Sequence, residues 1–260
     1  MTTVAVVPAR YASSRFPGKP LADDTGKYLI QHVHERVSQA CAVDRVVVAT
    51  DDQRIVEAVR SFGGEARMTR ADHPSGTDRV AEAVADLGLG DDDVVLNVQG
   101  DEPEIDAGDL DRLVDVTVSG ESNTRIGTLA VRFDNEGPRQ GAGSPLDPNC
   151  VKVVVDSRGR ALYFSRSLVP YPRQQQGVVE SPSDWLLHLG VYAFRASTLR
   201  EVTSLSIGGV SSLERIESLE QLRWLEHGLP VAVVVVDHAC VGIDTPEDYA
   251  AFVHRQGAGC

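Results

Sequence analysis

Three basic residues, Arg10, Arg15 and Lys19, stand among small residues in the segment 8–21. The segment reads Pro-Ala-Arg-Tyr-Ala-Ser-Ser-Arg-Phe-Pro-Gly-Lys-Pro-Leu and follows a short apolar run. Arginine, lysine and backbone amides are the usual ligands of a triphosphate with its roughly four negative charges, and small residues let the backbone approach it. The spacing matches neither a Walker loop nor the dinucleotide-binding G-x-G-x-x-G. The segment therefore predicts a nucleoside triphosphate site of another kind, with a basic surface loop as the alternative.

Two acidic residues follow apolar runs further along the chain. Asp101 comes after Val94–Val98, and Asp244 comes after Val241-Gly242-Ile243. An acid placed after a buried strand can hold a magnesium ion at the edge of a sheet. The same position also suits a helix cap. For Asp244 taken alone, the proline at position 246 favours the cap.

The basic and acidic residues together suit a substitution at phosphorus. Basic groups would hold the triphosphate, and carboxylates would hold magnesium against the α-phosphate. An acceptor oxygen then attacks in line and pyrophosphate leaves. Such chemistry depends on positioning and charge neutralisation more than on covalent help. We therefore expect Arg10, Lys19 and Asp101 to be the catalytic residues.

Apolar runs alternate with amphipathic segments over the first half of the chain. We expect strands at 3–7, 45–49, 65–68 and 93–98, and helices at 29–40, 53–62 and 77–85. This alternation predicts right-handed βαβ units and a mainly parallel sheet covered on both faces. Ligands bind outside the carboxyl ends of such strands, so the loops after Val7, Ala49 and Val98 should gather at one edge. An aspartate within 50–52 and Thr77 are the expected caps of the second and third helices.

After about residue 125 the pattern changes. Strands are expected at 128–133, 151–155, 161–164, 188–194 and 231–236, helices at 198–203, 213–227 and 246–255, a hairpin turn at 156–159 and a mobile loop at 173–183. We predict one three-layer α/β domain over residues 1–260 with a mostly parallel central sheet. Its nucleotide-binding part is 1–125 with 230–260. Its smaller, strand-containing part for acceptor binding and dimerisation is 126–229.

The composition argues against several classes of protein. With 38 acidic against 25 basic residues the net charge is −13, which argues against general nucleic-acid binding. No stretch approaches the roughly 20 apolar residues that span a bilayer, and no signal peptide is recognisable. The four cysteines have no metal-binding spacing and are expected to be free thiols. We expect a cytoplasmic protein with no membrane or nucleic-acid partner.

Eight segments match, in the same order, those of a known family. They are the segment 8–21, Ala-Thr-Asp at 49–51, Met-Thr-Arg-Ala-Asp-His-Pro-Ser-Gly-Thr-Asp-Arg at 68–79, Asn-Val-Gln-Gly-Asp-Glu-Pro at 97–103, Ala-Leu-Tyr-Phe-Ser-Arg at 161–166, His-Leu-Gly-Val-Tyr at 188–192, Leu-Glu-Gln-Leu-Arg at 219–223 and Gly-Ile-Asp-Thr-Pro-Glu-Asp at 242–248. The chain thereby resembles the 3-deoxy-manno-octulosonate (Kdo) cytidylyltransferases. The resemblance implies a glycosyltransferase-A-like fold, transfer of CMP from CTP with Mg²⁺ as cofactor, and a homodimer.

The resemblance also assigns residues to ligands. The nucleotide would bind Pro8, Ala9, Arg10, Ser14, Arg15, Lys19, Arg70, Ser75, Gly76 and Gln99. The acceptor would bind Arg15, Gln99, Arg166, His188, Tyr192, Glu220 and Gln221, and magnesium would bind Asp101 and Asp244. His188 and Tyr192 share one face of a strand, which fits a pocket or a core. Glu220 and Gln221 are expected mid-helix, diverging by about 100°, so that only one faces the ligand.

The chain departs from the family pattern on the acceptor side. The differences are Leu187 before the histidine, the segments 169–173 and 207–212, and a Gly- and Pro-containing loop at 134–147. They leave the nucleotide half intact and leave two acceptors open, Kdo or a related sugar acid, or a phosphonate such as phosphonoformate. A non-catalytic nucleotide-binding regulator is the alternative of another class. The presence of Lys19 and both acids argues against it.

Overall fold

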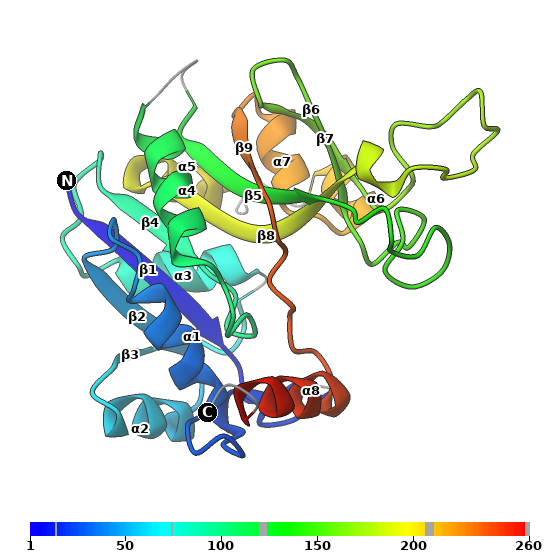
Figure 1. The fold of residues 1–260 in the computed structure, drawn as a ribbon. Coiled ribbons are helices and arrows are strands. Elements are labelled where there is room, and N and C mark those ends of the chain that lie inside the picture. Colours follow the sequence, from blue (N-terminus) through cyan, green and yellow to red (C-terminus); the bar gives the residue numbers. More distant parts are fainter. Residues whose placement is uncertain (14, 74, 120–123, 206–210, 258–260) are drawn as a thin grey trace. The chain divides into compact units, whose positions relative to one another are not determined.

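The computed structural model describes residues 1–13, 15–73, 75–119, 124–205 and 211–257 (Figure 1). The chain divides into two units. Unit 1 is Met1–Val114 with Cys240–Cys260, and unit 2 is Asp115–Ala239. Helix α4 (Ala107–Ser119) runs through the first of these boundaries. The division predicted near residues 125 and 230 concerns ligand binding and stays a prediction.

Unit 1 contains a parallel sheet made of apolar runs. Its strands are β1 (Thr3–Ala9), β2 (Arg45–Thr50), β3 (Glu65–Met68) and β4 (Val94–Asn97), in the order β3-β2-β1-β4. All three pairings are parallel. The valine and alanine side chains of β1, β2 and β4 are almost all fully buried. Burial on both faces explains why these runs are continuously apolar and not alternating.

Side chains cap some of the helices of unit 1 but not all of them. The helices are α1 (Leu29–Val37), α2 (Gln53–Ser61), α3 (Gly76–Val84) and α8 (Pro246–Gly257), with a short 3-10 helix, η1 (Lys19–Leu21). Asp52 caps α2, as predicted, by accepting from the Arg54 N–H at 2.9 Å. The prediction of Thr77 as the cap of α3 is wrong. Ser75 caps this helix by accepting from the Asp78 N–H at 3.1 Å, and Thr77 lies buried inside the first turn.

Unit 2 is built mainly from antiparallel strands. Strand β5 (Ile126–Arg132) pairs antiparallel with β8 (Leu186–Arg195) and parallel with β9 (Val231–Val236). Strands β6 (Lys152–Val155) and β7 (Ala161–Ser165) form a hairpin, whose predicted turn is closed by the Asp156 N–H on the Arg160 carbonyl at 2.8 Å. Strand β6 also pairs with β8. The 3-10 helix η3 (Pro182–Asp184) precedes β8, and α5 (Ala196–Leu205) follows it.

The helix predicted at 213–227 is in fact two short helices. They are α6 (Ser212–Glu217) and α7 (Gln221–Glu226). Ser218 between them has a left-handed backbone with φ 52°, a conformation that ends helices. Glycine is the residue that usually marks such a helix end in a sequence. A serine at this position gave no indication that the helix ends there. Glu220 and Gln221 therefore lie at the start of α7 and not in mid-helix.

The cysteines and the helix lengths can be compared with the expectations from composition. The described cysteines at 41, 150 and 240 are free, as predicted, and Cys260 lies outside the described residues. Over the described part of the chain, no helix combines the length and the apolar character that crossing a membrane requires.

Candidate functional site

The carboxyl ends of β1 and β4 bring two predicted segments to one edge of the unit 1 sheet. Val6 is opposite Asn97 in the parallel pairing, so the chain leaves both strands on the same side. Gly100 then passes so close to the Pro8 carbonyl that an added Cβ would lie 2.6 Å from its oxygen. Only glycine permits this approach, which fixes the path of the backbone immediately before Asp101.

Lys19 joins segments that are far apart in the sequence. Its Nζ donates to Asp101 Oδ2 at 2.8 Å and to the carbonyl oxygen of Ile243 at 2.6 Å, and it lies 3.7 Å from Asp244 Oδ1. The Lys19 side chain is only 12% exposed, so salt screens these interactions less than it would at the surface. Two carboxylates thus converge on one positive charge.

Asp244 is not the cap of α8. Thr245 and Asp248 form that cap, because the Asp248 N–H donates to Thr245 Oγ1 at 3.2 Å and the Thr245 N–H donates to Asp248 Oδ2 at 2.9 Å. The Asp244 carboxylate instead lies 3.1 Å from the Arg15 guanidinium and is half exposed. The capping explanation for Asp244 is therefore wrong, and its carboxylate stands beside two cations.

The donor chemistry of Asp101 and Asp244 fits a magnesium ion. Mg²⁺ is usually held by one or two carboxylates together with phosphate oxygens of the substrate. The two carboxylates already converge on one ammonium group, so they can serve a common cation. Within the described residues, no three His, Cys, Asp or Glu side chains form a group that could hold a metal. Phosphate oxygens of a bound nucleotide and water molecules would complete the coordination of the ion.

Glu102 is a site residue that was not predicted from the sequence. Burial, and after it the charge of Asp101, raises the pKa of Glu102 to about 8. The Glu102 carboxyl is then mainly protonated at neutral pH. Two adjacent acids directly after a buried strand were the available signal, since both cannot ionise cheaply where one is desolvated.

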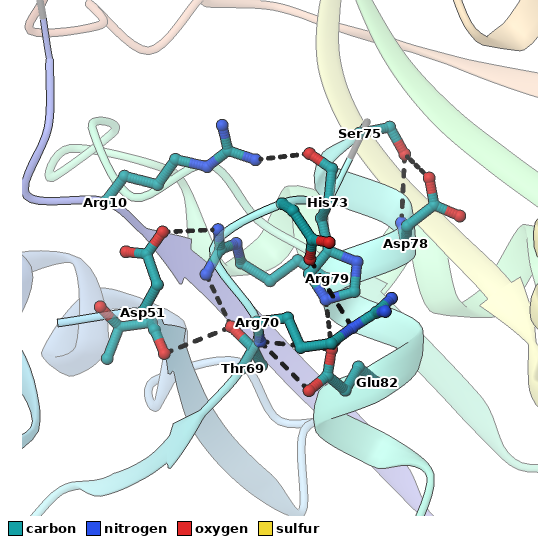
Figure 2. Close-up of polar contacts among 11 residues, drawn as sticks. Arg10, Asp51, Thr69, Arg70, His73, Ser75, Asp78, Arg79 and Glu82 are labelled. Atoms are coloured by element: carbon teal, nitrogen blue, oxygen red, sulfur yellow. Dashed lines mark hydrogen bonds and ion pairs between the residues drawn. The ribbon is translucent and has the colours of Figure 1, made fainter.

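Residues 69, 70, 73 and 75 are bound by side chains of α3, as Figure 2 shows. The contacts are Ser75 with Asp78, Thr69 with Arg79, and Arg70 and His73 with Glu82. The His73 carbonyl in turn accepts from the Arg10 guanidinium at 3.2 Å. The structure thus connects three of the predicted nucleotide residues, Arg10, Arg70 and Ser75, through one loop. Ser14, also predicted, lies outside the described residues.

His188 and Tyr192 lie on one face of β8, as their spacing predicts, with ring centroids 5.3 Å apart. The Thr128 hydroxyl donates to the Val191 carbonyl at 2.7 Å, so it accepts its 2.9 Å hydrogen bond from His188 Nε2. The imidazole is therefore protonated on Nε2, and burial lowers its pKa to about 3. His188 is a neutral hydrogen-bonding group and not a cation.

Tyr192 belongs to a buried aromatic cluster. Its ring packs edge-on against Trp224 at 5.1 Å and stacks on Phe194 at 5.9 Å between centroids. Burial raises the pKa of the Tyr192 hydroxyl well above its usual value. Packing alone accounts for this side chain, and its role toward an acceptor stays a prediction.

Arg166 donates to backbone carbonyls. Its guanidinium reaches the carbonyl oxygens of Glu217 at 2.7 Å, Pro148 at 3.0 Å and Ser218 at 3.4 Å. Glu217 completes the arrangement, because its carboxylate accepts from the Arg166 N–H at 2.9 Å. Arg166 thereby holds the break between α6 and α7, next to Glu220.

Lys152 is bound in the same way and was not predicted from the sequence. This side chain is fully buried, and its Nζ donates to the carbonyls of Asp147, Cys150 and Arg166 at 2.9, 2.5 and 2.7 Å. Burial lowers the pKa of Lys152. A lone lysine inside a strand of valines was the only signal in the sequence, and it predicted no partner.

The predicted site residues divide between the two units. Unit 1 holds Pro8, Ala9, Arg10, Arg15, Lys19, Arg70, Ser75, Gly76, Gln99, Asp101 and Asp244, and unit 2 holds Arg166, His188, Tyr192, Glu220 and Gln221. All predicted nucleotide and metal residues that the structure describes are thus in unit 1. Of the predicted acceptor residues, only Arg15 and Gln99 are there.

Comparison with known proteins covers almost the whole chain. Residues 4–233 match the family model described as cytidylyltransferase. The 3-deoxy-manno-octulosonate cytidylyltransferase of Syntrophotalea carbinolica is 48% identical over 254 residues, which are 95% of this chain and 96% of that protein. The protein of the same description from Porphyromonas gingivalis is 46% identical over 263 residues, 98% of this chain and 97% of its own.

Solved structures show the same likeness. CMP:2-keto-3-deoxy-manno-octonic acid synthetase complexed with CTP is 39% identical, with a TM-score of 0.85 over 100% of both chains. A cytidylyltransferase from Leptospira borgpetersenii, 17% identical, has a TM-score of 0.59 over 97% of this chain and 85% of its own, a likeness of fold alone. The predicted α/β fold with a mostly parallel central sheet is confirmed by the first of these structures.

Proposed function

This chain belongs to the cytidylyltransferase family, and on that premise we propose that it transfers CMP from CTP to 3-deoxy-manno-octulosonate and releases pyrophosphate. The observation that carries the proposal is the convergence of Asp101 and Asp244 on Lys19, with Arg15 on Asp244. These are the charges that a metal-assisted substitution at phosphorus needs. Relatives with the same activity in their descriptions match nearly the full chain.

In the proposed mechanism, cations of unit 1 hold the triphosphate. Arg15 and Lys19 already pair with carboxylates in the structure, and these pairs are exchangeable for pairs with phosphate oxygens. Asp101 and Asp244 would hold Mg²⁺, which supplies positive charge against the phosphate oxygens. Because Glu102 is neutral near pH 7, it adds no further negative charge beside the triphosphate.

The bond changes are those of one in-line displacement. A hydroxyl oxygen of the acceptor attacks the α-phosphorus and forms the new P–O bond. The bond from the α-phosphorus to the bridging oxygen breaks, pyrophosphate leaves with the electron pair, and the acceptor proton passes to solvent. Lys19 and Arg10 neutralise the charge that develops on the phosphate oxygens, so that the chain contributes positioning and electrostatics.

The acceptor and dimer assignments concern mainly unit 2. We assign acceptor binding to Gln99, Arg15, Arg166, His188, Tyr192, Glu220 and Gln221, with dimerisation in 126–229. The neutral His188 suits a hydrogen bond to a sugar hydroxyl, because it carries no charge of its own. Leu162, Tyr171 and Ile216 are large apolar side chains of this part that are exposed and so available for a contact with a second copy.

The two alternatives from the sequence have less support. The relatives from Syntrophotalea carbinolica and Porphyromonas gingivalis and the CTP-bound synthetase carry Kdo in their descriptions, and none of these three is described as acting on a phosphonate. A non-catalytic regulator has no need of two carboxylates beside one buried lysine. Kdo is therefore the acceptor we propose.

The decisive experiment measures pyrophosphate release from CTP and Mg²⁺ with a panel of acceptors. The panel contains Kdo, related sugar acids and phosphonoformate, and mass spectrometry identifies each product. We expect release with Kdo and a product with the mass of CMP-Kdo. A product with phosphonoformate and none with Kdo would replace the proposed acceptor. Binding of CTP with no turnover of any acceptor would support the regulator.

A further inference from the structure

Side chains of α3 hold a loop, and that loop holds Arg10 (Figure 2). We propose that Glu82 and Arg79 are positioning residues for the nucleotide, which act through the His73 carbonyl to orient Arg10 toward the triphosphate. The proposal rests on the proposed function. It adds two residues to which neither the sequence nor the comparisons give a role.

Arg79 anchors one end of the loop. Its side chain is fully buried and donates to Thr69 Oγ1 at 2.6 Å and to Asp51 Oδ2 at 3.0 Å. Thr69 is itself bound to the end of β2, because its N–H and its hydroxyl both donate to the Thr50 carbonyl, at 2.8 and 3.2 Å. A buried, charge-assisted pair of this kind has a strict geometry. The start of the loop is therefore fixed to α3 and to the carboxyl end of β2.

Glu82, about one turn further along α3, anchors the loop both at Arg70 and at His73. Its carboxylate accepts from the Arg70 N–H at 3.2 Å and forms a hydrogen bond with His73 Nε2. Burial acts to raise the pKa of Glu82, but hydrogen bonds from His73 and Arg70 bring it below its usual value. Glu82 is then ionised at neutral pH and binds the loop on both sides of the 71–72 turn.

Arg10 depends on this loop for its orientation. Its guanidinium donates to the His73 carbonyl at 3.2 Å. Among the described residues Arg10 makes no ion pair, whereas Arg15 and Lys19 each face a carboxylate. The positive charge of Arg10 is therefore available to a ligand. The group that orients its guanidinium is a backbone carbonyl and not a carboxylate. A shift of that carbonyl would therefore move the Arg10 guanidinium even when every residue that contacts the nucleotide is kept.

The same network contains buried polar atoms that lack a hydrogen bond. Within the part of the chain that the structure describes, His73 Nδ1 and Arg79 Nε are both buried and have no hydrogen-bond partner. Such atoms lower the stability of a fold, and they occur where a site requires a particular geometry. This is the expected signature of a loop held for its shape and not for its contribution to stability.

The test is a double-mutant cycle on CTP binding, measured by calorimetry with Mg²⁺ and without acceptor. Glu82→Ala should weaken CTP binding about tenfold, the effect of one lost charge-assisted hydrogen bond. Arg10→Met should weaken it at least as much. If Glu82 acts through Arg10, the double variant binds CTP no more weakly than Arg10→Met alone. Additive losses in the double variant would overturn the proposal.

A second variant and a control complete the design. Thr69→Val removes the partner of Arg79 with little change in shape, and its effect should likewise vanish in the Arg10→Met background, which decides the matter if Glu82→Ala does not fold. Glu65→Ala breaks an exposed pair with Arg45 (2.7 Å) on the same sheet and should leave CTP binding unchanged. Equal weakening by Glu65→Ala would show a general loss of structure and refute positioning. Failure of the unmodified protein to bind CTP would instead refute the proposed function.

Discussion

Two cations of unit 1, Lys19 and Arg15, and two of unit 2, Arg166 and Lys152, differ in the partners that hold them. In unit 1, Lys19 and Arg15 face the carboxylates of Asp101 and Asp244, and Lys19 has one further bond, to the Ile243 carbonyl. In unit 2, Arg166 and Lys152 each donate to three backbone carbonyls. The carboxylates are side chains that a metal ion can claim, whereas the carbonyls belong to the path of the chain.

The difference separates charges that are available for chemistry from charges that are used for folding. A lysine paired with an acid can exchange that acid for a phosphate without disturbing the backbone. A lysine bound to three carbonyls cannot leave without depriving three acceptors of their donor. We therefore expect substitutions in unit 1 to change activity and those at the carbonyl-bound cations to change stability.

The largest effect is expected at Asp101. Asp101→Asn removes a charge but keeps an oxygen that can accept from Lys19. The rate of pyrophosphate release should fall by about 10²- to 10³-fold, as for loss of a group that neutralises charge in the transition state. The midpoint of thermal unfolding should change little, since the carboxylate is partly exposed. A large loss of stability with retained activity would make Asp101 structural and break the comparison.

The next effect is expected at Lys152. Lys152→Met keeps the length of the side chain but leaves three carbonyls without a donor, so the free energy of unfolding should fall by about 3 kcal/mol. Chemical denaturation measures this change. Lys27→Met is the matched control, because Lys27 pairs with Glu35 at an exposed position (2.7 Å) and its loss should cost less than about 1 kcal/mol. Similar losses for both variants would contradict the role of the buried carbonyls.

A third effect concerns His188 and pH. The pKa of His188 is about 3 in the folded protein against 6.5 for a free histidine, so the unfolded chain binds the extra proton first as the pH falls. The free energy of unfolding is therefore unaffected by His188 above about pH 6.5. It decreases as the pH falls from 6.5 toward 3, because only the unfolded chain is protonated there. Between pH 7 and pH 5 the decrease amounts to about 2 kcal/mol. Chemical denaturation at both pH values measures the free energy of unfolding of the unmodified protein and of His188→Gln. The unmodified protein should lose about 2 kcal/mol more than the variant between pH 7 and pH 5. Equal losses in the two proteins would refute the prediction.

The smallest effect on stability is expected at Arg15. Its guanidinium is 65% exposed, so Arg15→Gln should change the free energy of unfolding by about 0.5 kcal/mol or less. The KM for CTP should nevertheless rise several-fold, which steady-state kinetics with varied CTP would measure. A loss of stability without any change in KM would place Arg15 with the carbonyl-bound cations instead.

The meeting of Lys19 and Asp101 in unit 1 could be predicted from the sequence, because it follows from strand order. Parallel strands end at one edge, so the residues after β1 and β4 had to be neighbours, and Lys19 does meet Asp101. Periodicity also predicted most strands and helices within a few residues. No pattern indicated that Thr245 and not Asp244 caps α8, because both residue types cap helices.

Less of unit 2 could be predicted, because its deciding contacts are to backbone atoms. Arg166 looked like a ligand for an anion, since an arginine after a strand carries no sign that carbonyls will occupy it. The break at Ser218 had no glycine to announce it and placed Glu220 at a helix start. Contacts between a side chain and a distant carbonyl leave no trace in residue types. Only the folded chain reveals them.

The hydrogen bond between Lys19 and the Ile243 carbonyl can form only late in the synthesis of the chain. The ribosome synthesises residues 1–114 of unit 1 first. The segment of unit 1 that contains Asp244 is synthesised only after all of unit 2, residues 115–239. The Ile243 N–H also donates to the Asp101 carbonyl at 2.9 Å, so the late segment binds both early ones. The nascent chain therefore carries Lys19 and Asp101 through most of translation before their last partner arrives. The contacts of Lys19 are therefore complete only after Ile243 and Asp244 have been synthesised.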